Sequence, residues 1–582
     1  MIYEARGSLV TERVLPPERQ TVGEDARIGV FVCHCGINIG GVVNVPSVAE
    51  YARTLPNVVF ATDNIYTCSQ DTQESIKEKI KEHNLNRVIV ASCSPRTHEP
   101  LFRATTREAG LNAYLFEMAN IRDQCSWVHM HEPEKATQKA KDLVRMAVAK
   151  ARMLEPLYNP TISITQTGLI IGGGLSGMTA ALELAELGFD AYLIEKGPVL
   201  GGNLRHLFYE PGADKKPQEV LAALRSRIAA NKRIHLHLNT TVTDIAGFMG
   251  NFESTLSNGI KIKHGAIIVA TGAKEYKPTE YMYGKNPSVV TQKELEERLA
   301  KGQAPKGPVV MIQCVGSRVP ERPYCSRVCC TNAVKNALKI KEIDPDTEVC
   351  VLYKDIRTYG FRENYYREAA EKGVRFIRYD DDNKPEVVDE GGLTVRTKDL
   401  VLGVSLEFKP AMVVLSAAII PEEGNEELAK MLKVPLTKDK FFLEAHMKLR
   451  PVDFATDGIF LCGLAHSPKF VDESISQASG AVARAQTVLS KDTMTLEPTL
   501  SKVIDENCDG CAYCVDPCPY KAITLIEYMR EGSVKKIVEV NEAACKGCGV
   551  CMATCPKKGI YVRGFKMEML NAMIDACLGV DQ

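Results

Sequence analysis

Eight cysteines near the end of the chain form two copies of one short motif. Each copy reads C-x2-C-x2-C-x3-C-P, and the copies start at Cys508 and Cys545. This spacing is typical of two-cluster ferredoxins, in which the fourth cysteine of each run ligates the other cluster. The sequence therefore predicts two [4Fe–4S] clusters that relay single electrons, with a pair of zinc sites as the alternative. The two predicted ligand sets are Cys508, Cys511, Cys514 and Cys555, and Cys518, Cys545, Cys548 and Cys551.

A glycine-rich loop earlier in the chain has the spacing of a dinucleotide-binding fingerprint. A buried strand, TGLII, leads into Gly172-x-Gly174-x-x-Gly177 at the start of a helix, and the next strand ends at Glu195. In such a βαβ unit the glycines let a pyrophosphate approach the helix N-terminus, and the acidic residue accepts hydrogen bonds from the ribose hydroxyls. A Rossmann-like turn that binds nothing is the alternative.

Three further segments favour FAD as the dinucleotide. The residues after Glu195, the strand and turn at 266–273, and the segment 456–486 resemble FAD-contact segments of flavin reductases. Leu464 stands where an acidic residue usually follows the last glycine, so we expect the contacts to the flavin ribityl chain to differ. The candidate contacts are Lys196, Gly201, Gly202, Asn203, Thr271, Gly272 and Gly463.

Four cysteines occupy the place where such reductases carry a second nucleotide-binding loop. The strand GPVVMIQ leads into CVGSR, and no second GxGxxG occurs within 305–410. Under reducing conditions, closely spaced cysteines indicate metal binding or catalysis. We therefore predict a third [4Fe–4S] cluster in place of a nicotinamide site, with structural or redox-active thiols as the alternative. Its ligands would be Cys314, Cys325, Cys329 and Cys330.

Strand-like runs between residues 26 and 130 each lead into a cysteine. The carboxyl ends of parallel strands line one crevice, so these cysteines can converge there. We predict Cys33, Cys35, Cys68 and Cys93 as candidate ligands of a fourth cluster, although Cys125 is a fifth candidate and the choice of four stays open. The alternative is buried structural cysteine, which packs as a small hydrophobic side chain.

Length, composition and charge limit the fold and the partners. A chain of 582 residues with 25% charged and 45% hydrophobic residues is globular, and its length suggests about three to five domains. A net charge of −1 without a long basic run argues against nucleic acid as a partner. The apolar run 411–420 is about half the length of a membrane span, and the N-terminus does not resemble a signal peptide. We expect a cytoplasmic protein with no membrane span.

The predicted fold is multidomain α/β. It combines an N-terminal parallel α/β domain, a thioredoxin-reductase-like FAD domain with a degenerate second nucleotide-binding domain, and a C-terminal two-cluster ferredoxin domain. The expected boundaries are an N-terminal extension at 1–25, the α/β domain at 26–133, a helical linker at 134–160, the FAD domain at 161–304 and 411–495, the degenerate domain at 305–410, the ferredoxin domain at 496–560 and a tail helix at 561–582.

The order of these motifs resembles the A-type subunit of heterodisulfide reductase over essentially the whole chain. The matching segments are VCHCGINIGG, ASCSPRTHEP, SWVHMHEPEKATQKAKDLVRMAVAKAR and IQCVGSR…YCSRVCC. The resemblance implies an FAD and iron–sulfur subunit that bifurcates electrons from a two-electron donor to a disulfide acceptor and a low-potential ferredoxin. The implied partners are B- and C-type subunits of heterodisulfide reductase, a hydrogenase, formate dehydrogenase or similar input module, and ferredoxin, in a complex that we expect to be dimeric.

The resemblance also assigns a role to one lysine. Lys335, five residues after Cys330, matches a lysine placed near the flavin N5 in that family. A cation there would favour a reduced, anionic flavin; a solvated helix lysine is the alternative. Methanogen members carry a ferredoxin-like insertion in the flavin domain, whereas 250–272 runs straight through that place. One proposed electron branch is therefore absent.

Three functions remain open at this point. The first is a bifurcating subunit of a heterodisulfide-reductase-like complex, and the second is a relay whose flavin does not split electrons. The third is an NAD(P)H-dependent disulfide reductase that works alone. The lack of a second GxGxxG, and of a CxxC beside the flavin motifs, argues against the third function.

Overall fold

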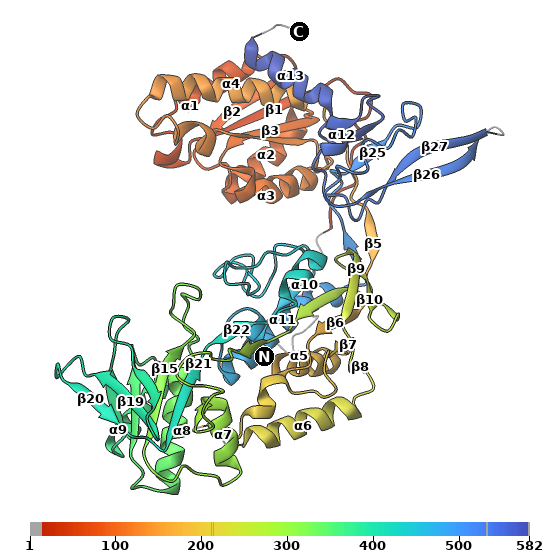
Figure 1. Cartoon of the computed structure of the whole chain (residues 1–582). Coiled ribbons are helices and arrows are strands. Elements are labelled where there is room, and N and C mark those ends of the chain that lie inside the picture. The colour runs from red at the N-terminus through yellow and green to blue at the C-terminus, as the bar shows by residue number, and fades with distance from the viewer. Residues whose placement is uncertain (1–13, 211, 213–214, 531–532, 580–582) are drawn as a thin grey trace. The chain divides into compact units, whose positions relative to one another are not determined.

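The computed structural model describes residues 14–210, 212, 215–530 and 533–579. The chain divides into two compact units. One unit contains Met1–Ile162 together with Thr495–Gln582, and the other contains Ser163–Met494. The described residues before Ser163 and after Met494 therefore share one unit, while the middle of the chain forms the other (Figure 1). None of the helices in the described ranges is long and apolar enough to cross a membrane.

The N-terminal domain is a parallel sheet between two layers of helices. Its strands lie in the order β2-β1-β3-β4. Helices α1 and α4 cover one face, and α2 and α3 cover the other (Figure 1). The bounds are β1 Ile28–Cys33, β2 Val58–Asn64, β3 Arg87–Ser92, β4 Phe116–Asn120, α1 Val45–Arg53, α2 Gln70–Glu82, α3 Pro95–Glu108 and α4 Pro133–Ala151.

Helix α4 is a layer of this domain, although most of it lies in the stretch that the sequence predicted as a linker. Its buried residues include Ala136, Ala140, Val144 and Ala147, which recur at the spacing of one helix face. These side chains join the core formed by β1, β3 and α1. The prediction differed from the structure because the many charged residues on the opposite face hid the apolar stripe.

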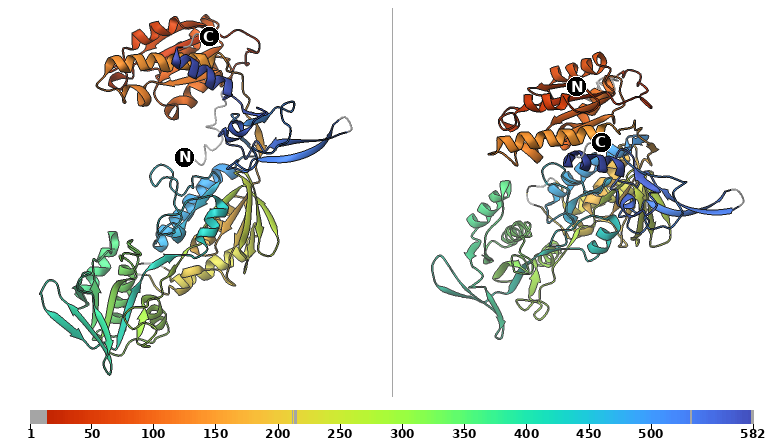
Figure 2. Two further views of the ribbon diagram at one scale, coloured as in Figure 1. Left: turned by 45° about the horizontal axis from the view of Figure 1, so that its top comes forward. Right: turned by 90° about the horizontal axis from the view of Figure 1, so that it is seen from above.

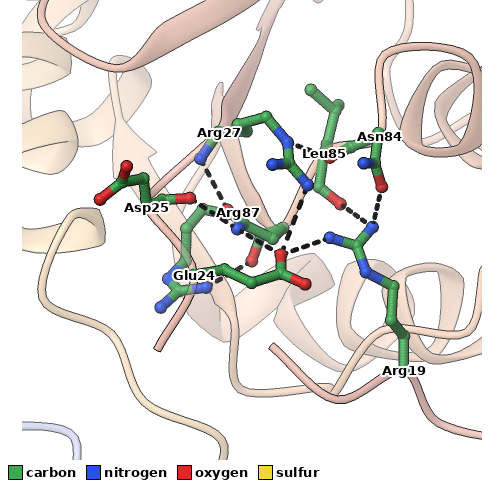
Figure 3. A network of polar contacts seen from close by, with 8 residues as sticks. Arg19, Glu24, Asp25, Arg27, Asn84, Leu85 and Arg87 are labelled. Carbon is green, nitrogen blue, oxygen red and sulfur yellow. Dashed lines mark hydrogen bonds and ion pairs between the residues drawn. The ribbon is translucent and has the colours of Figure 1, made fainter. Parts of the chain in front are cut away.

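The segment before β1, expected as an extension, is fixed to the domain by a polar network (Figure 3). The carboxylate of Glu24 accepts hydrogen bonds from Arg19 at 2.6 Å, Arg27 at 3.3 Å and Asn86 at 3.1 Å. Arg87, at the start of β3, donates to the carbonyl of Leu154 at 2.5 Å. These contacts lie at the amino ends of β1 and β3, so they leave the carboxyl ends of the strands available for a site.

The C-terminal domain is small and built around its cysteines. Strands β25 and β28 pair antiparallel, and β26 and β27 form a hairpin that extends beyond the rest of the domain (Figure 2). The final helix, α13, packs on α4, where Arg145 donates to the carbonyl of Ala576 at 2.5 Å. The bounds are β25 Ser501–Val503, β26 Ile523–Arg530, β27 Ser533–Val540, α12 Val550–Thr554, β28 Ile560–Val562 and α13 Met567–Leu578.

The second unit contains two α/β domains, of which the first carries the glycine-rich loop. Its parallel sheet has the order β23-β12-β6-β7-β8, flanked by α5, α6 and α11, with the antiparallel sheet β11-β10-β9 and helix α10 beside it. The bounds are β6 Thr167–Ile171, β7 Asp190–Ile194, β8 Ile234–His237, β9 Val242–Phe248, β10 Asn251–Leu256, β11 Lys261–His264, β12 Ala266–Val269, β23 Ile459–Leu461, α5 Leu175–Glu186, α6 Pro217–Ala230, α10 Asn425–Leu432 and α11 Val471–Leu489.

The second domain of this unit is wider than the predicted range 305–410. Strands β14 and β21 and helix α7 lie outside that range but belong to its sheet, β14-β21-β15-β16-β17. The apolar run MVVLSA forms β21, an interior strand between β14 and β15 that is buried at every position, which explains the difference. A meander, β18-β19-β20, adjoins this sheet, and β13 pairs with β22.

The bounds in the second domain are β13 Ala273–Glu275, β14 Val289–Thr291, β15 Val309–Val315, β16 Val349–Tyr353, β17 Arg375–Arg378, β18 Glu386–Asp389, β19 Leu393–Lys398, β20 Ser405–Phe408, β21 Met412–Ala417, β22 Ile419–Pro421, α7 Gln292–Ala300, α8 Cys329–Ile343 and α9 Glu363–Glu371.

Candidate functional site

The second unit contains a cavity of ≈ 370 Å³ that is lined by residues of both its α/β domains. Cavities of about 300–1,000 Å³ are the usual size for cofactors and small ligands. Eight of the predicted dinucleotide contacts lie in its wall: Gly172, Gly174, Glu195, Lys196, Gly202, Asn203, Thr271 and Gly272.

The glycine-rich loop packs too closely for side chains at two of its three glycines. A Cβ on Gly177 would lie 1.8 Å from the carbonyl oxygen of Gly172, and a Cβ on Gly172 would lie 2.3 Å from the carbonyl oxygen of Ala270. Gly174, the residue before α5, has open space on its Cβ side, with no other atom of the described chain within 4 Å. The helix N-terminus and this open space fit a pyrophosphate.

Glu195 joins the loops on either side of it. One carboxylate oxygen accepts from the backbone N–H of Gly173 and the other from that of Gly197, both at 2.7 Å. Asn203 donates to the carbonyl of Ala273 at 2.8 Å and so links two of the predicted FAD-contact segments. Lys196 is ion-paired with Glu422 at 2.7 Å on the cavity rim.

Three predicted contacts, Gly177, Gly201 and Gly463, shape the loops and lie outside the cavity wall. Gly201 donates to the carbonyl of Gly173 at 2.8 Å, which brings the two glycine-rich turns together. Gly463, at φ 69°, packs against Ser176. Leu464 does line the cavity. The missing acidic residue therefore leaves an apolar side chain at that position in the cavity.

One orphaned polar group and one cation in the wall also fit a bound FAD. The hydroxyl of Ser474 is buried and has no hydrogen-bond partner within the described residues. Lys469 donates to the hydroxyl of Ser467 at 2.7 Å. Burial, followed by the nearby charge of Arg327, lowers the pKa of Lys469 to about 8. The sequence analysis missed Lys469, whose only signal is its place six residues after Gly463 in the closing segment.

The structure brings the four middle cysteines together beside this cavity. Cys314 lies at the end of β15, Cys325 in the loop, and Cys329 and Cys330 at the start of α8. Cys329 lines the cavity itself. Burial, together with the neighbouring thiols of Cys330 and Cys325, raises the pKa of Cys314 to about 11. Such a set of thiols can bind a metal cluster, and each thiol would lose its proton on binding.

Lys335 is buried, which excludes the alternative of a solvated helix lysine. Its ammonium donates to the carbonyl of Tyr209 at 3.0 Å and lies 2.9 Å from the carboxylate of Glu296 and 3.8 Å from that of Glu210. The described cavity wall includes Glu296 and Glu210 but not Lys335. The lysine thus lies behind two carboxylates, neither of which the sequence analysis had singled out.

The C-terminal cysteines surround two small cavities in the two groups that their spacing predicts. Cys508, Cys511, Cys514 and Cys555 line one cavity, and Cys518, Cys545, Cys548 and Cys551 line the other. In the described ranges no three His, Cys, Asp or Glu side chains converge as ligands of a single metal ion. The thiols instead surround a space, as the ligands of a multi-iron cluster do.

Four of the five N-terminal cysteines converge at the carboxyl edge of the sheet. Burial raises the pKa of Cys35, Cys68 and Cys93, and thiols of the same group, including Cys33, raise each of them further. Cys125 lies in the core beneath α4, where its thiol donates to the carbonyl of Ala136 at 3.0 Å. The structure thus brings together the four candidate ligands and separates the fifth.

The fold and these sites define a class of protein, an iron–sulfur flavoprotein with oxidoreductase chemistry. Residues 167–312 match the family model described as pyridine nucleotide-disulphide oxidoreductase, and residues 507–559 match the 4Fe-4S dicluster domain. The chain resembles thioredoxin reductase of Lactococcus lactis at 19% identity with a TM-score of 0.41, covering 56% of this chain and 99% of that one.

Relatives with matching sequences identify the family. The A-type subunit of the H2:CoB-CoM heterodisulfide,ferredoxin reductase of Methanothermobacter marburgensis is 40% identical, covering 96% of this chain and 99% of the relative. An iron-sulfur A-type subunit of CoB–CoM heterodisulfide reductase from Methanopyrus kandleri is 39% identical, with 87% and 92% covered. The chain belongs to the family of heterodisulfide reductase A-type subunits. The predicted family, fold class and oxidoreductase class are confirmed, as are binding of FAD and of [4Fe–4S] clusters.

Proposed function

We propose that this chain distributes electrons within a heterodisulfide-reductase-like complex by flavin-based bifurcation. Two electrons enter from a donor, one leaves toward a disulfide-type acceptor, and the other leaves toward a low-potential ferredoxin. The bound FAD supplies the exchange between two-electron and one-electron chemistry. The residues of the chain hold the FAD, exclude a nicotinamide and provide the thiolates for one-electron exits.

The observation that carries this proposal is the position of Cys329. This cysteine lines the dinucleotide cavity and also belongs to the set that includes Cys314, Cys325 and Cys330. Strand β15 contains Cys314 and ends at Val315, where a nicotinamide-binding loop would begin. A cluster held here would be the nearest one-electron acceptor to FAD, and a nicotinamide would lack its glycine-rich cradle.

The cysteine sets support a proposal of four clusters in the chain. Two would lie in the C-terminal domain and one beside the flavin. The fourth would be held by Cys33, Cys35, Cys68 and Cys93, whose thiols meet at one edge of the sheet. A multi-cluster chain of this kind provides separate routes for single electrons, because cluster potentials span about −700 to +450 mV.

The names of the relatives suggest partners for this chain. The relative from Methanococcus maripaludis belongs to an H2/formate:CoB-CoM heterodisulfide,ferredoxin reductase, and that from Methanosarcina acetivorans to a ferredoxin/F420H2-dependent CoB-CoM heterodisulfide reductase. The donors in these names differ. We therefore propose a hydrogenase, formate dehydrogenase or similar input module, with B- and C-type subunits on the acceptor side and ferredoxin as the second acceptor, in a dimer of the complex.

The flavin domain of this chain runs straight through the place where the resemblance leads us to expect a ferredoxin-like insertion in methanogen members. Residues 251–269 pass directly from β10 through β11 to β12. The alignment with the Methanothermobacter marburgensis relative spans 663 positions, more than the 582 residues here, so that relative has residues without a counterpart. We propose that ferredoxin exchanges electrons through the C-terminal domain or through a partner subunit.

The proposed function is tested by measuring whether the reduction of ferredoxin requires the disulfide acceptor. The native complex is purified with its partner subunits, and donor oxidation is followed with ferredoxin, with the disulfide acceptor, and with both. Bifurcation predicts ferredoxin reduction only when both acceptors are present, with one electron to each per donor molecule oxidised. Ferredoxin reduction without the disulfide acceptor would favour the second candidate, a relay that does not bifurcate, which the same cysteine sets also support.

A further inference from the structure

A strained arginine lies beside the cysteine set next to the flavin cavity. Arg318 adopts φ 54°, a left-handed conformation that is strained for residues other than glycine. Its backbone N–H donates to the carbonyl of Tyr324 at 3.1 Å, which closes the loop. This bond places Arg318 between Cys314, four residues before it, and Cys325, which directly follows Tyr324. Strain of this kind persists where the surrounding structure fixes it.

The charges around Arg318 leave this side of the cysteine set positive. The carboxylate of Asp355 lies 2.8 Å from the guanidinium of Arg318, 3.7 Å from that of Arg357 and 3.8 Å from that of Arg378. One carboxylate therefore faces three guanidinium groups. The thiol of Cys330 lies 3.7 Å from the backbone carbonyl of the same Asp355, so these cations lie beside the cysteine set.

Three buried hydrogen-bond donors in the same segments have no partner within the described residues. They are Nη1 of Arg318, the hydroxyl of Ser317 and the hydroxyl of Thr331. A buried polar group without a hydrogen-bond partner destabilises the folded state. Ser317 is close in the chain to Cys314, and Thr331 directly follows Cys330. The sulfur atoms of an anionic iron–sulfur cluster held by these cysteines would accept hydrogen bonds from these donors, whereas neutral thiols are only weak acceptors.

We propose that Arg318, with Ser317 and Thr331, raises the reduction potential of the cluster held by Cys314, Cys325, Cys329 and Cys330. The positive charge favours the reduced cluster, which carries one more electron, and hydrogen bonds to its sulfurs act in the same direction. This cluster would therefore be the preferred acceptor of an electron from FAD. The inference rests on the proposed function, because it assumes a cluster at these cysteines.

The alternative is that Arg318 only holds the loop in place through Asp355. Two substitutions separate the roles, because Arg318→Gln removes the charge and keeps a planar donor, whereas Arg318→Lys keeps the charge. Arg396→Gln is the matched control. Arg396 lies on β19 and pairs with Glu386, Glu390 and Glu407 of the same meander.

The test is a potentiometric titration of the full chain, loaded with FAD and clusters and followed by electron paramagnetic resonance. The signal of this cluster is assigned by its loss in Cys325→Ala. We expect Arg318→Gln to shift its midpoint to a more negative potential while the C-terminal clusters keep theirs. Arg318→Lys and Arg396→Gln should stay close to the unsubstituted protein, and Ser317→Ala should shift less than Arg318→Gln in the same direction.

An unchanged midpoint in Arg318→Gln would overturn the inference while leaving the proposed function intact. If Arg318→Gln fails to hold the cluster, the midpoint potentials of Ser317→Ala and Arg318→Lys test the inference instead. A negative shift in Ser317→Ala with an unchanged midpoint in Arg318→Lys supports the inference, and any other combination contradicts it. A full chain with about eight irons and no third cluster signal would refute the proposed cluster and this inference together.

Discussion

The ammonium of Lys335 lies 2.9 Å from the carboxylate of Glu296, and the two side chains are 1% and 3% exposed. The pair joins α8 to α7 directly behind the wall of the flavin cavity. Glu296 lines that cavity, whereas Lys335 lies behind the carboxylates of Glu296 and Glu210.

Breaking this pair should destabilise the flavin-binding unit more than removing it entirely. Removing one partner leaves a buried charge uncompensated, which costs about 3–5 kcal/mol. We expect Lys335→Met to lose about this much and Lys335→Met with Glu296→Gln to lose clearly less. The measurement is urea unfolding of the full chain, followed by the fluorescence of released FAD. A double variant that loses as much unfolding free energy as Lys335→Met, or more, would contradict this prediction.

The close packing of the glycine-rich loop predicts a sharp difference between two glycine substitutions. A methyl group at Gly177 would meet the carbonyl oxygen of Gly172 at 1.8 Å, so Gly177→Ala must push α5 away from the loop. Overpacking costs about 1–3 kcal/mol, which we expect to weaken FAD binding about tenfold to a hundredfold. Gly424→Ala is the control, because that site is open in the described structure. FAD titration of the apoprotein measures both, and equal affinities would contradict this prediction.

The iron content of two cysteine variants tests whether the N-terminal cysteines hold a cluster or only pack in the core. Cys68 is exposed and faces the thiols of Cys33 and Cys35, whereas Cys125 is enclosed beneath α4. Cys68→Ala should lower the iron content by about four atoms per chain, the content of one [4Fe–4S] cluster. Cys125→Ala should keep the full complement. Identical iron contents in the two variants would mean that the N-terminal thiols bind no cluster.

A buried histidine in the flavin-binding unit predicts acid sensitivity. Burial lowers the pKa of His264 from 6.5 to about 4, and Ser254 lies 2.8 Å from its ring nitrogen. The folded state thus binds fewer protons than the unfolded state between these values. Stability should therefore be complete above pH 6.5 and fall as the pH drops toward 4, by up to about 3 kcal/mol. Urea midpoints between pH 7 and 5 measure this loss. Ser254→Ala with His264→Phe should flatten the dependence, and an unchanged slope would contradict it.

The sequence was most informative where the chemistry is local. The spacing from Cys508 to Cys555 predicts which thiols share a cavity, because in this motif the first three thiols of a run stay together and the fourth joins the other cluster. The convergence of Cys33 with Cys68 and Cys93 also follows from a rule, since parallel strands end at one edge. Neither prediction required knowledge of long-range packing.

Contacts between distant segments could not be predicted in the same way. Glu296 is 39 residues from Lys335, and Asp355 is 37 residues from Arg318, so no motif connects the members of either pair. The same limit applies to β21, which pairs with β15 across about a hundred residues and places the domain boundary beyond the predicted one. Only tertiary packing brings these groups together.

Electron transfer from FAD to a cluster held by Cys329 and its neighbours is the step on which the proposed function depends. It is tested most directly by photoreducing the flavin, without nicotinamide or partner subunits, and following its reoxidation in the unsubstituted chain and in Cys329→Ala. We predict rapid flavin reoxidation with reduction of the adjacent cluster in the unsubstituted chain, and loss of this phase, at unchanged FAD content, in Cys329→Ala. Equal reoxidation kinetics in the two proteins would contradict the proposed transfer.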